Sequence, residues 1–155
     1  TQTIVTTHFT NILYELLDET FEQVRGIYLD KGTSLFETLA TISAEEASRP
    51  VGGRCATLAA QVEHVRFYLD VLESHMIKQA MVQVDWGEIW RTVHAVTPDE
   101  WAASQARLQT TYQRVRAAMQ TLTWDEDDIG NTLAIVVHTA HHLGEIRQAL
   151  CMIQP

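Results

Sequence analysis

The chain has 155 residues, of which 46% are hydrophobic and 20% charged, so it holds enough apolar material for one ordinary domain and is not expected to be globally disordered. It carries 20 acidic residues against 11 Lys plus Arg, which gives a formal charge of -9. This acidic balance argues against a protein that binds nucleic acid by neutralising phosphates, and against electrostatic docking on anionic membranes.

Neither a membrane-spanning segment nor a signal peptide is expected from the sequence. No apolar run approaches the roughly 20 residues that a membrane helix needs. Residues 1–7 are polar and lack the basic and apolar regions of a signal peptide. The sequence therefore predicts a cytoplasmic protein.

A single domain over residues 1–155 is predicted, because no internal repeat, low-complexity stretch or linker interrupts the chain. Cys55 and Cys151 are too few and too far apart for a disulfide scaffold or a CxxC zinc site. We expect both to be reduced thiols that pack as small buried residues.

The first helix is predicted over residues 7–28, since the strict alternation typical of strands is absent and apolar residues recur every three or four positions. Its apolar stripe consists of Phe9, Leu13, Leu16, Leu17, Val24 and Ile27. After a break at residues 30–34, a short extra helix is predicted over residues 35–42. Ser43 and Glu46 then have the spacing of a capping box, which favours another helical turn.

The second long helix is predicted over residues 54–81, after the loop at residues 50–53. Its apolar positions advance by four and three residues in turn, as in the seam of a helical bundle. They are Leu58, Val62, Val65, Leu69, Leu72 and Met76. Residues 85–96, which include Trp86 and Trp90, are predicted to form a longer connection with room for a turn of helix.

The third helix is predicted from Pro98 to Leu122, because Thr97 and Glu100 form a capping box around a first-turn proline. Its stripe consists of Leu108, Tyr112, Val115, Met119 and Leu122. Thr123 and Glu126 repeat the capping pattern, and the acidic residues up to Asp128 suit a helix N-terminus.

The fourth helix, which continues to Met152, is apolar on two faces that we expect to be opposite each other. One face holds Leu133, Val136, Val137, Ala140 and Leu143, and the other holds Ile135, Ile146, Ala149 and Ile153 beside His138 and His142. Such a helix is either central in the fold or shared with another subunit.

Histidines carry the clearest chemical signal. His138 and His142 are one helical turn apart, so their rings project from one face and are spaced to chelate a metal ion. His64 lies at the flank of the second helix, where a groove against a neighbouring helix would admit a shared site. Three histidine ligands leave coordination positions open for water or substrate, as in catalytic metal sites. The alternative is that these histidines are solvated or hydrogen-bonded and bind no metal.

The other histidines lack such a partner. His141 points about 100° away from His142 and is expected to have a structural or supporting role. His8, His75 and His94 are expected on the surface.

Two segments resemble the DinB/YfiT-like family. In residues 138–148, an H-x3-H pattern is followed two residues later by Gly144, as in the family's closing motif. Residues 61–69 around His64 resemble the family's ligand-bearing second helix, and the surroundings of Trp86 and Trp101 also fit. One departure is that Leu143 and Glu145 replace the Arg and Gln that commonly flank the glycine.

The resemblance implies an all-α four-helix bundle with up-down-down-up topology, often dimeric. It also implies one divalent metal ion, which is nickel, zinc or iron in different members, held here by His64, His138 and His142. Similar proteins include transferases and isomerases that use low-molecular-weight thiols such as bacillithiol or mycothiol. The expected function is therefore a metal-dependent enzyme that activates an external thiol for attack on a small electrophile.

Three alternatives remain: a metal-dependent hydrolase that uses bound water, a non-enzymatic metal-binding dimer, and a helical protein without metal. Glu63, Asp70 and Glu145 are near the ligand segments but are assigned no role. Tyr68 is expected to pack in the core or to donate to a substrate. The four tryptophans either wall a pocket above the metal or close the ends of the bundle; they are Trp86, Trp90, Trp101 and Trp124.

Overall fold

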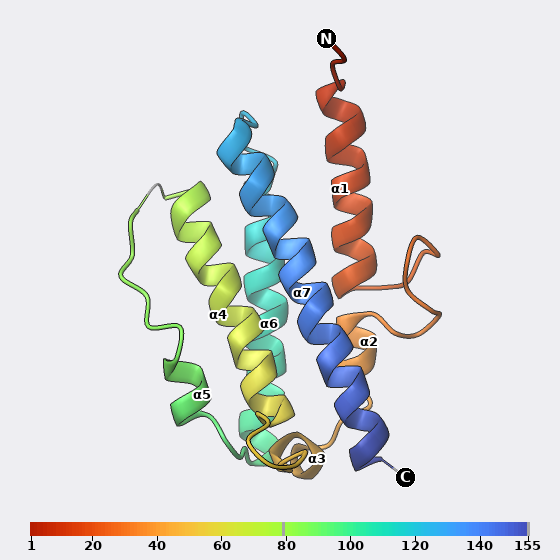
Figure 1. Ribbon diagram of the computed structural model, residues 1–155, viewed down its shortest axis with the longest axis vertical. Helices are drawn as coiled ribbons and strands as arrows, with labels where there is room; N and C mark the ends of the chain where they lie inside the picture. Colours follow the sequence, from red (N-terminus) through yellow and green to blue (C-terminus); the bar gives the residue numbers. More distant parts are fainter. Residues whose placement is uncertain (79, 155) are drawn as a thin grey trace.

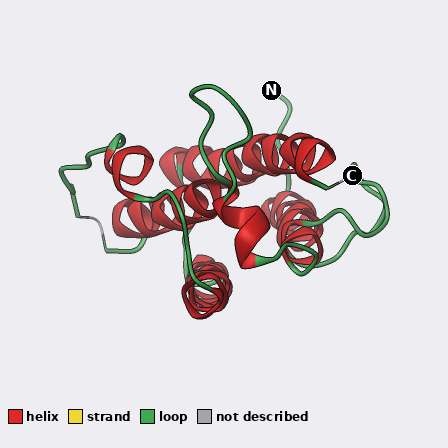
Figure 2. Ribbon diagram, turned by 90° about the horizontal axis from the view of Figure 1, so that it is seen from below, coloured by secondary structure: helices red, strands yellow, loops and turns green. Residues whose placement is uncertain are grey.

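The computed structural model describes residues 1–78 and 80–154, and every regular element in this part of the chain is a helix (Figures 1 and 2). Gln79, which the predicted second helix includes, and Pro155, the last residue of the predicted domain, lie outside the described residues. None of the described helices combines the length and the apolar character that a membrane crossing requires.

Four long helices are joined by segments that contain three short ones (Figure 1). The long helices are α1 (Thr6–Phe21), α4 (Leu58–Met76), α6 (Pro98–Met119) and α7 (Glu126–Ile153). The short helices are α2 (Leu35–Leu39), α3 (Ala44–Ser48) and α5 (Glu88–Thr92).

Side-chain contacts give the relative directions of α4, α6 and α7. Glu63 bonds to Ser104 and Glu73 bonds to Arg114, so α4 and α6 run in the same direction. Gln61 bonds to Glu145 whereas His64 contacts His138, so α7 runs opposite to α4. In Figure 1, α1 descends like α7, and both point opposite to α4 and α6.

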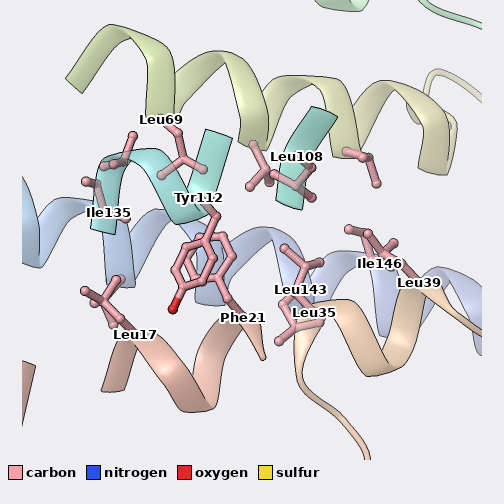
Figure 3. Packing of buried hydrophobic residues seen from close by; sticks show 14 of the residues in the cluster. Leu17, Phe21, Leu35, Leu39, Leu69, Leu108, Tyr112, Ile135, Leu143 and Ile146 are labelled. Atoms are coloured by element: carbon pink, nitrogen blue, oxygen red, sulfur yellow. The ribbon is translucent and has the colours of Figure 1, made fainter. Parts of the chain in front are cut away.

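The core lies between the long helices and is closed on one side by α2 (Figure 3). Phe21 of α1 stacks on Tyr112 of α6, with ring centroids 4.2 Å apart. All six predicted seam residues of α4 are buried, and so are four of the five in the predicted stripe of α6, with Leu122 half-buried beyond the helix end. Burial of these side chains is the main force that holds the helices together.

The helix starts follow local capping, and two of the predictions need correction. Thr97 and Glu100 form the predicted capping box of α6. The second helix begins at Leu58, not at residue 54, because the Thr57 side chain accepts the N–H of Ala60 and thereby caps it. The last helix begins at Glu126, because its cap is Asp125 and not Thr123.

The first helix ends at Phe21, seven residues before the predicted end. The fully buried Glu19 carboxylate accepts backbone N–H groups from Arg25, Ile27, Tyr28 and Leu29, which folds the following segment back over the helix end. These N–H groups can no longer bond to carbonyls four residues earlier, as a continuing helix would require. The predicted stripe positions Val24 and Ile27 therefore lie outside the helix.

Two predictions about burial were wrong. Leu143 and Ile146, assigned to opposite faces of the last helix, are both buried. Side chains three residues apart on a helix point in directions only about 60° apart, so these two lie on the same face. Leu133 and Val137 are instead exposed, at 41% and 68%. Cys55 and Cys151 are unpaired as expected but exposed, not buried.

Candidate metal centre

Three histidines from two helices converge in the groove between α4 and α7. His64 comes from α4, and His138 and His142 lie one turn apart on α7. The three residues each offer a ring nitrogen, and these nitrogens all lie within 4.8 Å of one another. His64 and His142 are buried and His138 is half-buried. The antiparallel course of the two helices is what brings residue 64 beside residues 138 and 142.

The Nε2 atoms of His64 and His138 are 3.0 Å apart. As a hydrogen bond, this contact needs a proton on one of the two nitrogens. Two nitrogens that ligate one tetrahedral zinc ion are about 3.3 Å apart, given Zn–N distances of about 2.0–2.1 Å. The observed spacing is therefore close to that of two ligands facing a common cation.

The ring of His142 is oriented by Gln61, one turn before His64 on α4. The Oε1 atom of Gln61 is 2.6 Å from His142 Nδ1, and Gln61 Nε2 donates to Glu145 Oε2 at 3.0 Å. A carbonyl oxygen can only accept, so Nδ1 carries the ring proton and the Nε2 lone pair is left for a metal. The sequence did not indicate that Gln61 accepts a hydrogen bond from His142. The one feature that could have indicated it is the one-turn spacing between Gln61 and His64.

Burial keeps the three imidazoles neutral. Burial is the larger cause, and together with the charges of the neighbouring histidines it lowers the pKa of His64 to about 4 and that of His138 to about 3. The pKa of His142 is also lowered by burial, although the nearby Glu145 opposes this shift. Neutral imidazole is the form that binds a metal, so the site needs no deprotonation at neutral pH.

Aromatic side chains cover two sides of the histidine group. The Trp90 ring from α5 lies 4.4 Å from the His64 ring, and Tyr68 stacks on His138 at 3.7 Å with nearly parallel planes. Trp86 lies behind Tyr68, with its ring 5.9 Å away. Of the four tryptophans, Trp86 and Trp90 therefore lie near the site.

Trp101 and Trp124 have packing roles instead. Trp101 is buried and its indole N–H donates to the carbonyl of Ile42, while Trp124 packs edge-on against Phe9.

The residues present fit a divalent metal ion, with one departure from common metal sites. Ligand number, ligand spacing and neutral imidazoles all suit an ion such as zinc, nickel or iron. Histidine ligands usually donate their outer N–H to a neighbour, as His142 does to Gln61. The Nδ1 atoms of His64 and His138 are buried without such a partner.

The remaining candidates have other surroundings. The buried Glu63 accepts hydrogen bonds from Ser104, Arg107 and Arg66, which lower its pKa although burial opposes that shift. Asp70 pairs with Arg66 and Arg114. Both carboxylates thus belong to ion pairs between α4 and α6, and neither is among the groups around the three histidines.

His141 is exposed and lies 3.2 Å from Glu145. His8, His75 and His94 are exposed, as predicted. Comparison of the chain with protein-family models, with curated proteins and with solved structures found no match.

Proposed function

We propose that the protein is a metal-dependent enzyme of the DinB/YfiT-like kind that uses His64, His138 and His142 to hold one divalent ion and acts with an external low-molecular-weight thiol on a small electrophile. The observation that carries the proposal is the convergence of three neutral, largely buried imidazoles from two helices. Nickel, zinc and iron are the candidate ions.

The ion would lower the pKa of a thiol or water molecule at its open positions and so provide a nucleophile at neutral pH. The chain's own residues position and shield the site. Gln61 orients His142, and the rings of Trp90 and Tyr68 limit the access of water beside His64 and His138. Such shielding strengthens the electrostatic interactions inside the site.

An external thiol is favoured because Cys55, which lines a cavity beside Gln61 and Glu145, and Cys151 both lie outside the histidine group. Neither Cys55 nor Cys151 belongs to the groups of potential ligands found in the described part of the chain. A reducing cytoplasm, which keeps such thiols reduced, is the location that fits this chemistry.

The helix directions support the up-down-down-up bundle that the resemblance implies. The shared direction of α1 and α7, opposite to that of α4 and α6, is what this order of helices would require. A homodimer is part of the proposal, with the exposed Leu133 and Val137 of α7 as the apolar surface available for it. Light scattering that gives the mass of one chain at micromolar concentrations would contradict the dimer.

The test of the function is thiol consumption by the metal-loaded protein with halogenated nitrobenzenes. In the expected reaction, the thiol sulfur bonds to the ring carbon, the carbon–halogen bond breaks, halide leaves with the bonding pair and the thiol proton passes to solvent. Turnover should be lost in His138→Ala and retained in His75→Ala, whose parent residue is exposed and outside the site. Circular dichroism would show that both variants fold.

Other outcomes would replace the proposal. Ester hydrolysis without thiol would favour the hydrolase. No turnover with any thiol or ester, together with melting that depends on metal, would favour a metal-binding module without catalysis.

A further inference from the structure

A sizeable cavity lies next to the side chains that surround His142. It has a volume of about 640 Å³ and opens between the start of α4, the outer face of α7 and the loop that precedes α4. Its size suits a small organic molecule.

Two residues belong both to the wall of this cavity and to the surroundings of His142. Gln61 and Glu145 line the cavity, and they also lie 2.6 Å and 3.1 Å from His142 Nδ1. A molecule that fills the cavity would thus lie one side chain away from the histidine group.

The lining is mostly apolar and carries charge of one sign. Its apolar part includes Val51, Leu58, Ala149 and Met152. Glu145 is the only carboxylate in the lining, His141 lines the cavity 3.2 Å from it, and no lysine or arginine from the described residues does so. A bound anion would therefore meet the Glu145 carboxylate with no lysine or arginine in the lining to offset its charge, so the lining itself disfavours an anion when the metal is absent.

A second cavity differs from the first in having a cationic side chain in its lining. It has a volume of about 600 Å³, shares Cys55 and Ala56 with the first, and is lined by Arg54 and Trp90.

Gly144 keeps the larger cavity wide. It lies within α7, where glycine costs a helix about 1 kcal/mol relative to alanine. A Cβ atom at this position would meet no atom within 4 Å, so its side chain would extend into open space at the cavity wall.

We propose that this cavity binds the organic substrate of the enzyme, and that this substrate is an uncharged or cationic, largely apolar molecule and not an anion. The proposal names the substrate class for the function proposed above and rests on it. Its test measures binding in the absence of turnover, so the two proposals can fail separately.

The experiment measures equilibrium binding of 3-nitrobenzamide and 3-nitrobenzoate by calorimetry. These probes have similar shapes and differ in charge, and neither carries a leaving group that the exposed Cys55 could displace. Binding is measured on the protein as purified and again after chelator treatment, because a carboxylate can also ligate a metal ion. The metal content of each sample is determined separately.

The variants are Gly144→Leu, which fills the cavity, and Gly130→Leu as its matched control. Gly130 also lies within α7 with no atom within 4 Å of a Cβ, but it does not line the cavity. We expect the benzamide to bind at least about tenfold more weakly to Gly144→Leu, a difference of about 1.4 kcal/mol, and unchanged to Gly130→Leu.

Charge selectivity is tested in the metal-free protein. The benzamide should bind about tenfold more tightly than the benzoate, and Glu145→Gln should reduce this ratio. Equal or tighter binding of the benzoate would overturn the proposed substrate class. Undiminished benzamide binding by Gly144→Leu, or no binding of either probe by the wild-type chain, would overturn the assignment of the cavity.

Discussion

Of the three proposed ligands, His142 has the ring that is most completely held in place. Its outer nitrogen faces Gln61, whose amide is itself oriented by Glu145. His64 and His138 have no partner at their outer nitrogens and are held by ring contacts with Trp90 and Tyr68. The three ligands are therefore positioned in two different ways, by hydrogen bonding and by stacking.

Replacing Gln61 by Leu should weaken metal binding by up to about 10- to 100-fold, because His142 loses the nearer of the two acceptors at its Nδ1 atom and Glu145 loses the amide that positions it. Competition with a chromogenic chelator measures this affinity. Gln113→Leu, at an exposed position of α6, serves as the control and should not change it. Equal affinities of the two variants would show that Gln61 does not orient the ligand.

The sequence indicated the three histidines and, as one alternative, Tyr68, Trp86 and Trp90 beside them, but not the hydrogen-bond partner of His142. The one-turn spacing of His138 and His142 predicted a pair of metal ligands. His64 was predicted as the third ligand from the family resemblance and from its place at the flank of its helix. Gln61 and Glu19 carry no comparable signal, because the identity of their partners depends on how distant segments fold. A glutamine next to a helix seam and a glutamate near a helix end are ordinary surface residues in sequence alone.

Glu19 is expected to make the free energy of unfolding depend on pH in the acidic range. Backbone N–H groups lower its pKa from 4.5 to about 2 although burial opposes the shift. The folded state therefore binds a proton less readily than the unfolded state, so the stabilisation is complete above pH 4.5 and is lost as the pH falls toward 2.

Urea unfolding of the metal-free protein at pH 5.5 and 3.5 checks this expectation. Glu19→Gln should lower the free energy of unfolding by about 2–4 kcal/mol at the higher pH, because one of the two accepting oxygens is replaced by an NH2 group that can only donate. The difference between wild type and variant should shrink at the lower pH. A difference that stays constant over this range would contradict the assigned role.

At the scale of helices, the buried positions within each helix could be predicted from the sequence more reliably than the residues at which the helices begin and end. The seam of α4 and the capping box of α6 depend on residues close together in sequence, and both were predicted correctly. The end of α1 depends on a loop that closes back onto Glu19, so apolar spacing through Val24 and Ile27 was misleading. The exposure of Leu133 and Val137 likewise depends on which neighbour covers α7.

Truncation of Leu69 tests the packing of α4 against the other helices. Leu69 is buried in the core, whereas Leu133 is 41% exposed on α7. Leu69→Ala should cost about 2–5 kcal/mol in the free energy of unfolding, and Leu133→Ala should cost less than about 1 kcal/mol in the monomer. Chemical denaturation of both variants gives the comparison, and similar losses would refute the assigned register of α4.

At the scale of the whole molecule, the histidine group links fold stability to pH. The pKa values of His64 and His138 are lowered from 6.5 to about 4 and about 3. The unfolded chain therefore takes up protons before the folded chain does, and the metal-free protein loses stability as the pH falls from 6.5 toward 4. Above pH 6.5 these two groups should have no such effect.

Melting temperatures of the chelator-treated protein between pH 7.5 and 4.5 check this dependence. His138→Gln removes one of the two groups, so its melting temperature should fall less with acid than that of the wild type. Parallel profiles for the two proteins would show that His138 is not buried as a neutral imidazole.

The most direct test of the central claim is metal analysis of the chain purified without an affinity tag and reconstituted at neutral pH. We expect about one equivalent of a divalent transition metal per chain, retained through gel filtration and lost in His64→Ala, His138→Ala and His142→Ala. A folded wild-type chain that retains no stoichiometric ion would contradict the assignment of these three histidines as a metal centre.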